Sequence, residues 1–243
     1  LNVPNATLTL STPASVDITF YVTSGTPPTA TTPPTVTIPA GQTSVPLTGL
    51  VGSAIYQVYV KYSCSATGPT IGWLKAYEFS TPCSVINGNF FEGFESTLTG
   101  SSTNNTHPYC WTYIETSTST SVYGYVSTTP KTGSNSFYAY RTNLNSGPGD
   151  LMLISPETNN LGSGTKQIRF WARSSSTSTT PNLVIYTMDG TTATSNKTKI
   201  IDIAITSTTY KEYIVPLPAT SDDYFTFSFE HTLPGEAPAV YLD

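Results

Sequence analysis

The feature that most constrains this chain is the absence of a helical period along a sequence full of short β-branched and aromatic runs. No window of about 12 residues keeps apolar side chains at the helical spacing without a Pro, a Gly or a run of Thr. Segments such as VDITFYV (Val16 to Val22) and YQVYVKY (Tyr56 to Tyr62) are β-branched and aromatic instead, and Pro and Gly clusters separate them. The chain is therefore predicted to be all-β, with strands at the spacing of a sandwich.

Alternating residues within single segments predict which side chains face the core. In DDYFTFSFEH, Phe225, Phe227 and Phe229 fall on one face of the expected strand, because successive side chains point to opposite sides. Ile201, Ile203 and Ile205 likewise fall on one side of IIDIAI. The pair Asp189-Gly190 predicts a hairpin turn after NLVIYTM. Burying each such side chain stabilises the fold by about 1.5–3 kcal/mol.

Composition indicates a secreted β-protein and excludes some partners. Charged residues make up 10% of the chain, which is well below the usual quarter, and Ser and Thr supply the polarity instead. The net charge of -5 and the lack of a basic cluster exclude nucleic acid, because phosphates need clustered cations. No apolar run long enough to span a membrane and no signal peptide is present, so we expect a piece of a longer, multidomain exported chain.

Residues 87–113 combine acids with aromatic anchors. Glu92 and Glu95 lie among three Phe residues, and a polar loop leads from them to Cys110 and Trp111. This pattern predicts the opening strand of a sandwich, with its acids at a sheet edge. A glycosidase needs two carboxyls facing one another across a cleft, whereas acids three apart in a strand point to opposite faces. Neither of the two histidines lies in a catalytic or metal motif, so we predict no enzyme.

Residues 1–82 resemble a fibronectin type III module. The resemblance rests on LTGL (47–50), the aromatic-led YQVYVKYSC (56–64) and the closing FSTP (79–82). It covers the second half of such a module, because no Trp follows the second expected strand. The resemblance implies a small β-sandwich in which Leu50 and Tyr56 pack together under a turn.

Residues 83–243 resemble the MAM-like jelly-roll domains of the cleaved-adhesin and choice-of-anchor J type. Five short motifs match in order: FEGFE (91–95), PYCW (108–111), LISP (153–156), FWAR (170–173) and YLD (241–243). The resemblance implies a larger jelly-roll sandwich. It also implies a protein that Bacteroidetes export, by type IX secretion, to the cell surface or the extracellular space.

The same resemblance implies a structural calcium site. Related jelly rolls join an acid of the first strand to an acid near the last one, and the matching residues here are Glu95, or failing it Glu92, and Asp243. Asp150, in GPGDLML, is a third candidate. The alternative is that these acids only solvate the ends of strands.

Three cysteines leave one without a partner. Cys83 and Cys110 flank the opening segment of the second domain, and a bridge between them would stabilise by roughly 3–4 kcal/mol. A bridge from Cys64 to Cys83 is the competing pairing. The spacing matches no zinc motif, so zinc is not expected.

A sugar-binding face is the remaining candidate site. Arg169, Trp171 and Arg173 alternate along one side of QIRFWARS, and an aromatic ring between planar donors is suited to carbohydrate. Four tyrosines alternate in a similar way and would extend this surface: Tyr123, Tyr125, Tyr138 and Tyr140. In the alternative, which we favour, Trp171 is a core residue and recognition belongs to loops at 101–107 or 143–149.

Two functions are consistent with these patterns. The first is a non-catalytic adhesion or interaction segment of a large exported surface protein, whose partner is a glycan or a protein. The second is an accessory carbohydrate-binding module of a secreted hydrolase.

Overall fold

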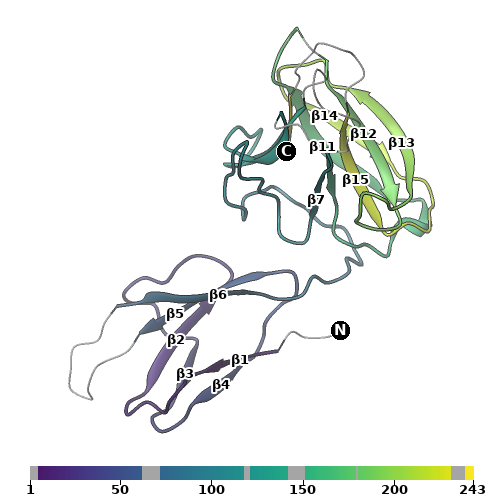
Figure 1. Ribbon diagram of the computed structural model, residues 1–243. Helices are drawn as coiled ribbons and strands as arrows, with labels where there is room; N and C mark the ends of the chain where they lie inside the picture. The colour runs from purple at the N-terminus through teal and green to yellow at the C-terminus, as the bar shows by residue number, and fades with distance from the viewer. Residues whose placement is uncertain (1–4, 62–71, 118–120, 142–150, 179, 231–238) are drawn as a thin grey trace. The chain divides into compact units, whose positions relative to one another are not determined.

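The computed structural model describes residues 5–61, 72–117, 121–141, 151–178, 180–230 and 239–243 (Figure 1). The chain divides into two compact units, Leu1–Ser84 and Val85–Asp243. Strands make up nearly all of the regular structure in both units, which confirms the predicted all-β class. Among the described residues, no helix is long and apolar enough to cross a membrane.

The first unit consists of two small antiparallel sheets. One is the pair β1–β4, and the other has the strand order β3-β2-β5-β6. The bounds are β1 Ala6–Thr9, β2 Ile18–Thr23, β3 Val36–Ile38, β4 Ser44–Leu47, β5 Ile55–Lys61 and β6 Leu74–Ser80. Leu50 and Tyr56 belong to one buried cluster, as expected, and the Tyr56 hydroxyl accepts a hydrogen bond from the Val51 amide at 3.0 Å.

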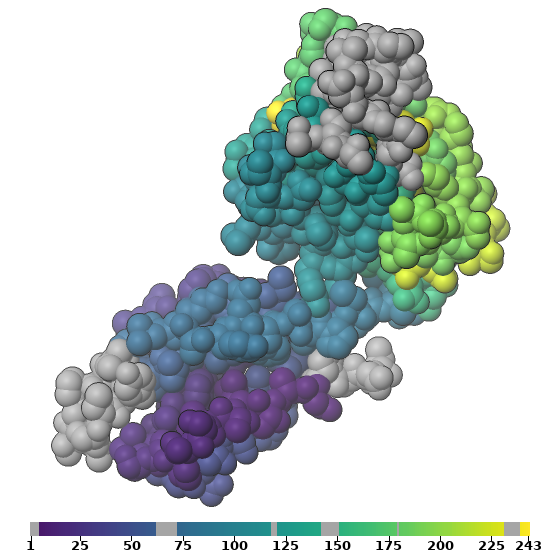
Figure 2. Space-filling model, viewed as in Figure 1, coloured from purple at the N-terminus to yellow at the C-terminus, as the bar shows by residue number. Residues whose placement is uncertain are grey.

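The second unit is a sandwich of two five-stranded antiparallel sheets with the strand orders β13-β12-β15-β10-β7 and β14-β11-β16-β9-β8. The bounds are β7 Thr112–Glu115, β8 Val122–Ser127, β9 Ser136–Arg141, β10 Leu151–Ile154, the 3-10 turn η1 Leu161–Ser163, β11 Gln167–Ser174, β12 Asn182–Met188, β13 Lys197–Ala204, β14 Lys211–Pro216, β15 Tyr224–Glu230 and β16 Ala239–Leu242. In the space-filling view, the segment of residues 85–130 in teal and the β12–β13 hairpin in green cover separate parts of this unit's surface (Figure 2).

The core of the sandwich follows the alternation seen in the sequence. Phe225, Phe227 and Phe229 are all buried between the sheets, together with Ile168 and Phe170 of β11. Phe227 and Phe170 meet edge to face with ring centres 5.1 Å apart, so aromatic contacts join the two layers.

Two local expectations on β12 and β13 are wrong. Ile201 does not share the burial of Ile203: it pairs with Ile185 at the point where the register shifts, and it is 43% exposed. The connection is also longer than a two-residue hairpin, since β12 ends at Met188 and β13 begins at Lys197. Asp189 organises this loop by accepting the Asn196 amide at 2.9 Å.

The expected opening strand at the start of the second unit is absent. Residues 88–93, which we call the strap, are in neither a strand nor a helix. The backbone leaves an extended path at Phe94, which has a φ of 61° in the left-handed region. Phe94 is nevertheless buried in the core, so one aromatic residue anchors the end of the strap.

Candidate functional site

Five tyrosines form a continuous surface on the outer side of the β14-β11-β16-β9-β8 sheet. Tyr123 of β8 pairs across the sheet with Tyr140 of β9, Tyr125 pairs with Tyr138, and Tyr138 pairs on its other side with Tyr241 of β16. Cross-strand partners project from the same side of a sheet. Every one of these side chains is half-buried. We call this surface the tyrosine face.

The rings of the tyrosine face contact one another from strand to strand. The ring centres of Tyr123 and Tyr140 are 5.1 Å apart, those of Tyr125 and Tyr138 are 5.1 Å apart, and those of Tyr138 and Tyr241 are 4.9 Å apart. Burial raises the pKa of the Tyr138 phenol and, to a smaller extent, those of Tyr123 and Tyr125. A tyrosine hydroxyl is protonated at neutral pH even without such a shift, so these groups can donate hydrogen bonds.

Arg173 and Trp171 continue this surface onto β11. The guanidinium carbon of Arg173 lies 3.8 Å from the centre of the Tyr241 ring and 5.4 Å from that of Tyr210. Trp171 is half-buried rather than part of the core, so the interpretation we favoured from the sequence is wrong. The reason is its position on the outer side of β11, where the Lys131 ammonium lies 4.8 Å from the centre of the indole ring.

Arg169 lies on the same side of β11 but has a different role. Its guanidinium forms an ion pair with Glu212 of the neighbouring strand β14, and the Arg169 side chain is 64% exposed. An exposed pair of this kind contributes little to stability. Arg169 is thus held toward Glu212, whereas Arg173 packs on tyrosine rings.

Glu95 and Asp243 both bind the loop that connects β8 and β9. A carboxylate oxygen of Glu95 accepts the amides of Ser134 at 2.9 Å and Asn135 at 3.0 Å. One Asp243 oxygen accepts the amides of Lys131 at 2.5 Å and Thr132 at 3.0 Å. The two acids are far apart in the sequence, yet both bind the same loop.

The groups around these two acids are only partly suited to bind a metal cation. Two carboxylates on one loop supply oxygen ligands, but backbone N–H groups already bind both oxygens of Glu95 and one oxygen of Asp243. The other ligands would have to be backbone carbonyls and water. Within the described ranges, no group of three or more His, Cys, Asp or Glu residues is placed to hold a metal. Asp150 lies outside the described residues.

Glu92 is engaged elsewhere, with the aromatic residues of the strap region. It accepts the Phe94 amide at 2.6 Å, and it also interacts with the indole N–H of Trp111. Burial raises the pKa of the Glu92 carboxyl, although these hydrogen bonds oppose the shift. Glu92 therefore orients Trp111 and does not take part in the loop held by Glu95.

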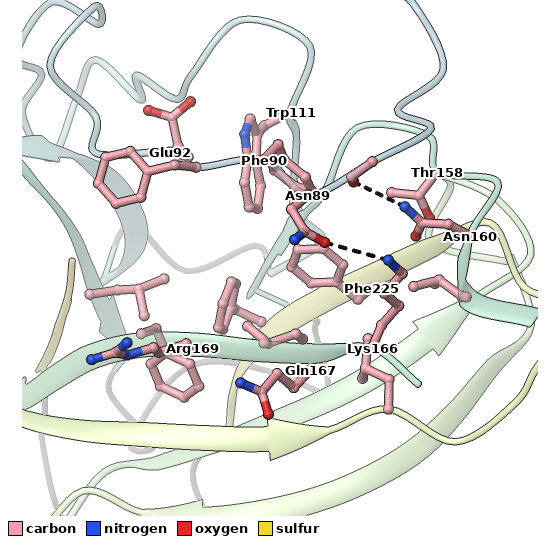
Figure 3. Close-up of a pocket in the computed structure, with 18 of the residues that line it drawn as sticks. Asn89, Phe90, Glu92, Trp111, Thr158, Asn160, Lys166, Gln167, Arg169 and Phe225 are labelled. Atoms are coloured by element: carbon pink, nitrogen blue, oxygen red, sulfur yellow. Dashed lines mark hydrogen bonds between the residues drawn. The ribbon is translucent and has the colours of Figure 1, made fainter. Parts of the chain in front are cut away.

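A pocket of about 770 Å³ lies between the strap and the first residues of β11. In Figure 3, Asn89 and Phe90 of the strap lie on one side of it, and Lys166, Gln167 and Arg169 lie on the other. Trp111 and Phe225 form part of its wall, with ring centres 5.9 Å apart in an edge-to-face contact. The sequence does not predict the pocket, because the alternation in this segment is typical of a strand.

The cysteines and histidines add no catalytic centre to the described part of the chain. Cys83 and Cys110 are both disulfide-bonded, while Cys64 lies outside the described residues. His107 is exposed and stacks on Tyr113 with ring centres 6.0 Å apart. His231 and the loop at 143–149 also fall outside the described residues, and residues 101–107 form a largely exposed loop.

The second unit is an all-β, two-layer sandwich with an aromatic outer face and a pocket at one edge. No protein-family model and no curated protein matches the chain. Several solved structures are similar in fold. The K1 cleaved adhesin domain of Lys-gingipain from Porphyromonas gingivalis W83 has 19% identity and a TM-score of 0.47, covering 60% of this chain and 94% of that one.

Two other solved structures are similar in fold, with lower sequence identities and TM-scores. The K2 cleaved adhesin domain of Lys-gingipain has 17% identity and a TM-score of 0.44 over 60% of this chain and 96% of that one. A family 30 carbohydrate-binding module of a cellulosomal cellulase from Clostridium thermocellum has 11% identity and a TM-score of 0.38 over 54% and 87%. At these identities the similarity concerns the fold alone.

Proposed function

We propose that the chain is a non-catalytic adhesion or interaction segment of an exported surface protein, and that the tyrosine face is its recognition surface. The observation that carries this proposal is the set of ring contacts that joins Tyr123, Tyr140, Tyr138 and Tyr241 across three strands. Tyrosine combines a rigid apolar ring with a polar hydroxyl, and it is enriched at interfaces for that reason. The disulfide-bonded cysteines support an oxidising, extracellular location.

A glycan on a surface is the partner that this face fits best. A sugar ring has an apolar C–H side that can pack on an aromatic ring, and hydroxyls that accept or donate hydrogen bonds. The tyrosine face offers both, because its rings are half-exposed and a tyrosine hydroxyl can donate and accept hydrogen bonds. Arg173 adds a planar donor beside Tyr241.

The second candidate function is an accessory carbohydrate-binding module of a secreted hydrolase. The same tyrosine face favours it, since a row of rings along a sheet suits an extended polysaccharide. The neighbouring domains of the full protein separate the two functions: further binding domains support the adhesion segment, and a catalytic domain supports the module.

A structural calcium ion at Glu95 and Asp243 is part of the proposal. Both carboxylates already bind the β8–β9 loop, so an ion there would tie the same loop to the C-terminal strand. Its role would be to stabilise the sandwich beside the tyrosine face and not to perform chemistry.

A glycan array probed with the purified chain tests the function. We expect binding to a defined set of glycans and weaker binding to the same glycans in Tyr123→Ala. Binding that is unchanged in Tyr123→Ala, or the absence of any binding to glycans and to extracellular proteins, would contradict the proposal.

A further inference from the structure

The pocket beneath the strap has an aromatic wall that reaches solvent through one ring. Phe90 contacts Trp111 with ring centres 6.3 Å apart and Phe225 with ring centres 6.1 Å apart, yet Phe90 is 40% exposed. Trp111 and Phe225 are themselves buried. Phe90 therefore presents an aromatic surface at the mouth of the pocket while it is packed on the core behind it (Figure 3).

Polar groups surround the mouth. Lys166 donates a hydrogen bond to the Asn89 side-chain oxygen at 3.4 Å, and the Asn160 amide donates to the Gly88 carbonyl at 3.0 Å. Figure 3 shows both interactions on the side of the pocket where the strap approaches β11. Gln167 is exposed at the start of β11, and its side chain makes no hydrogen bond within the described part of the chain. Amide groups of this kind can both donate and accept.

The strap itself is positioned by contacts at its two ends. Ile86 pairs with Thr158 in a parallel bridge just before the strap, and Phe94 is anchored in the core just after it. Glu92 accepts the Phe94 amide and holds the indole of Trp111. The pocket is therefore preformed by the chain, which lowers the cost of ordering a ligand site.

We infer that this pocket binds one neutral sugar residue of a glycan. Its volume of about 770 Å³ falls within the range of about 300–1,000 Å³ that is usual for small-molecule sites. The C–H side of a pyranose ring can pack on the aromatic wall. Its hydroxyls can form hydrogen bonds with the amides at the rim. A purely apolar side chain would leave the amides of Asn89 and Gln167 without partners, and such unpaired polar groups weaken binding.

A neutral sugar is favoured over a charged one by the balance of charges at the mouth. Lys166 is bound to Asn89, and Arg169 is paired with Glu212, so neither cation is aimed at a ligand carboxylate. Glu92 would repel an anion on the strap side. None of the five tyrosines of the tyrosine face lines the pocket, although Trp171, which continues that face onto β11, does.

The indole N–H signals of the chain give a direct test. The chain has three tryptophans, Trp73, Trp111 and Trp171, so a ¹H–¹⁵N spectrum contains three such signals, which Trp→Phe variants assign. The probes are the methyl glycosides of glucose, galactose, mannose and N-acetylglucosamine at about 10 mM, because single sugars bind with Kd values in the millimolar range or weaker. We expect at least one glycoside to shift the Trp111 signal saturably and to leave Trp73 unchanged.

Two variants test whether the shift of the Trp111 signal comes from binding in the pocket. Gln167→Ala and Phe90→Ala remove an exposed amide and a half-exposed ring, and each should weaken the glycoside about tenfold, the loss expected for one hydrogen bond or one ring contact. Gln42→Ala in the first unit and Leu98→Ala, an 85% exposed residue outside the pocket, are the matched controls and should bind as the parent does.

Three results would overturn the inference: no glycoside moves the Trp111 signal, the shift is the same in Gln167→Ala and Phe90→Ala, or only a short Phe-containing peptide moves Trp111. The proposed function fails separately. Glycan binding that Tyr123→Ala weakens, without any shift at Trp111, would support the tyrosine face and reject the pocket.

Discussion

The Arg173 guanidinium lies 3.8 Å from the centre of the Tyr241 ring, across the pairing of β11 with β16. This contact joins the charged residues of β11 to the tyrosines of β16, β9 and β8. It links Arg173, which was predicted as a ligand-binding residue, with Tyr241, which was not.

Removing a ring from the tyrosine face should weaken glycan binding more than removing only a hydroxyl. Tyr123 contacts Tyr125, Tyr138 and Tyr140, so Tyr123→Ala disrupts the middle of the surface. We expect glycan affinity to fall about 5–10-fold, which corresponds to roughly 1–1.5 kcal/mol for an aromatic contact. Tyr123→Phe keeps the ring and should fall less. Equal losses in the two variants, measured by calorimetry, would assign recognition to the hydroxyl instead.

Trp171→Ala should destabilise the sandwich by about 1–2 kcal/mol. The ring is half-buried and loses a cation–π contact with Lys131 that is worth about 0.5–1 kcal/mol. Phe170→Ala, the next residue on the buried side of the same strand, should cost about 3–5 kcal/mol. Denaturant unfolding of both variants measures the difference. Similar losses for the two would show that Trp171 behaves as a core residue.

Calcium should raise the melting temperature through Glu95 and Asp243. An ion that binds only the native state stabilises it by mass action, by about 2.7 kcal/mol at a concentration of 100 Kd. Added chelator should lower the melting temperature of the parent and leave Asp243→Asn unaffected. A parent curve that chelator does not move would leave both acids as acceptors for the β8–β9 loop only.

The disulfide should join Cys83 to Cys110 and leave Cys64 as a thiol. Peptide mapping without reduction should recover one linked pair and an alkylated Cys64. Cys83→Ser and Cys110→Ser should each lower stability by roughly 3 kcal/mol, because the loop between the two cysteines is no longer closed in the unfolded chain. Recovery of a Cys64–Cys83 peptide would reject this pairing.

Glu92 should make stability depend on acid pH. Burial raises its folded pKa above 4.5, so its contribution to stability is complete below pH 4.5 and is lost as the pH rises through the folded value. Glu92→Gln keeps an acceptor for the Phe94 amide but cannot ionise. Relative to the parent, this variant should therefore become more stable between pH 4 and pH 7. Parallel stability curves from urea unfolding at each pH would contradict the expected shift.

The sequence by itself determined the class of the fold and the faces of its strands. Phe225, Phe227 and Phe229 alternate with polar residues, and a strand can bury such a set only against a second layer. The same alternation placed Arg169, Trp171 and Arg173 on one side of β11. Period-two patterns are local, so they are readable without knowing which strands are neighbours.

Only the tertiary structure decided which faces meet and where the chain leaves the strand pattern. The contact of Arg173 with Tyr241 depends on β16 pairing with both β11 and β9, and no local pattern reports strand order. The exposure of Trp171 depends on whether anything covers the outer side of its sheet. The strap reads as a strand in FFEGFES, yet the left-handed backbone at Phe94 and the anchoring of that ring in the core turn it into the rim of a pocket. These outcomes come from long-range packing, which couples residues that the sequence keeps far apart.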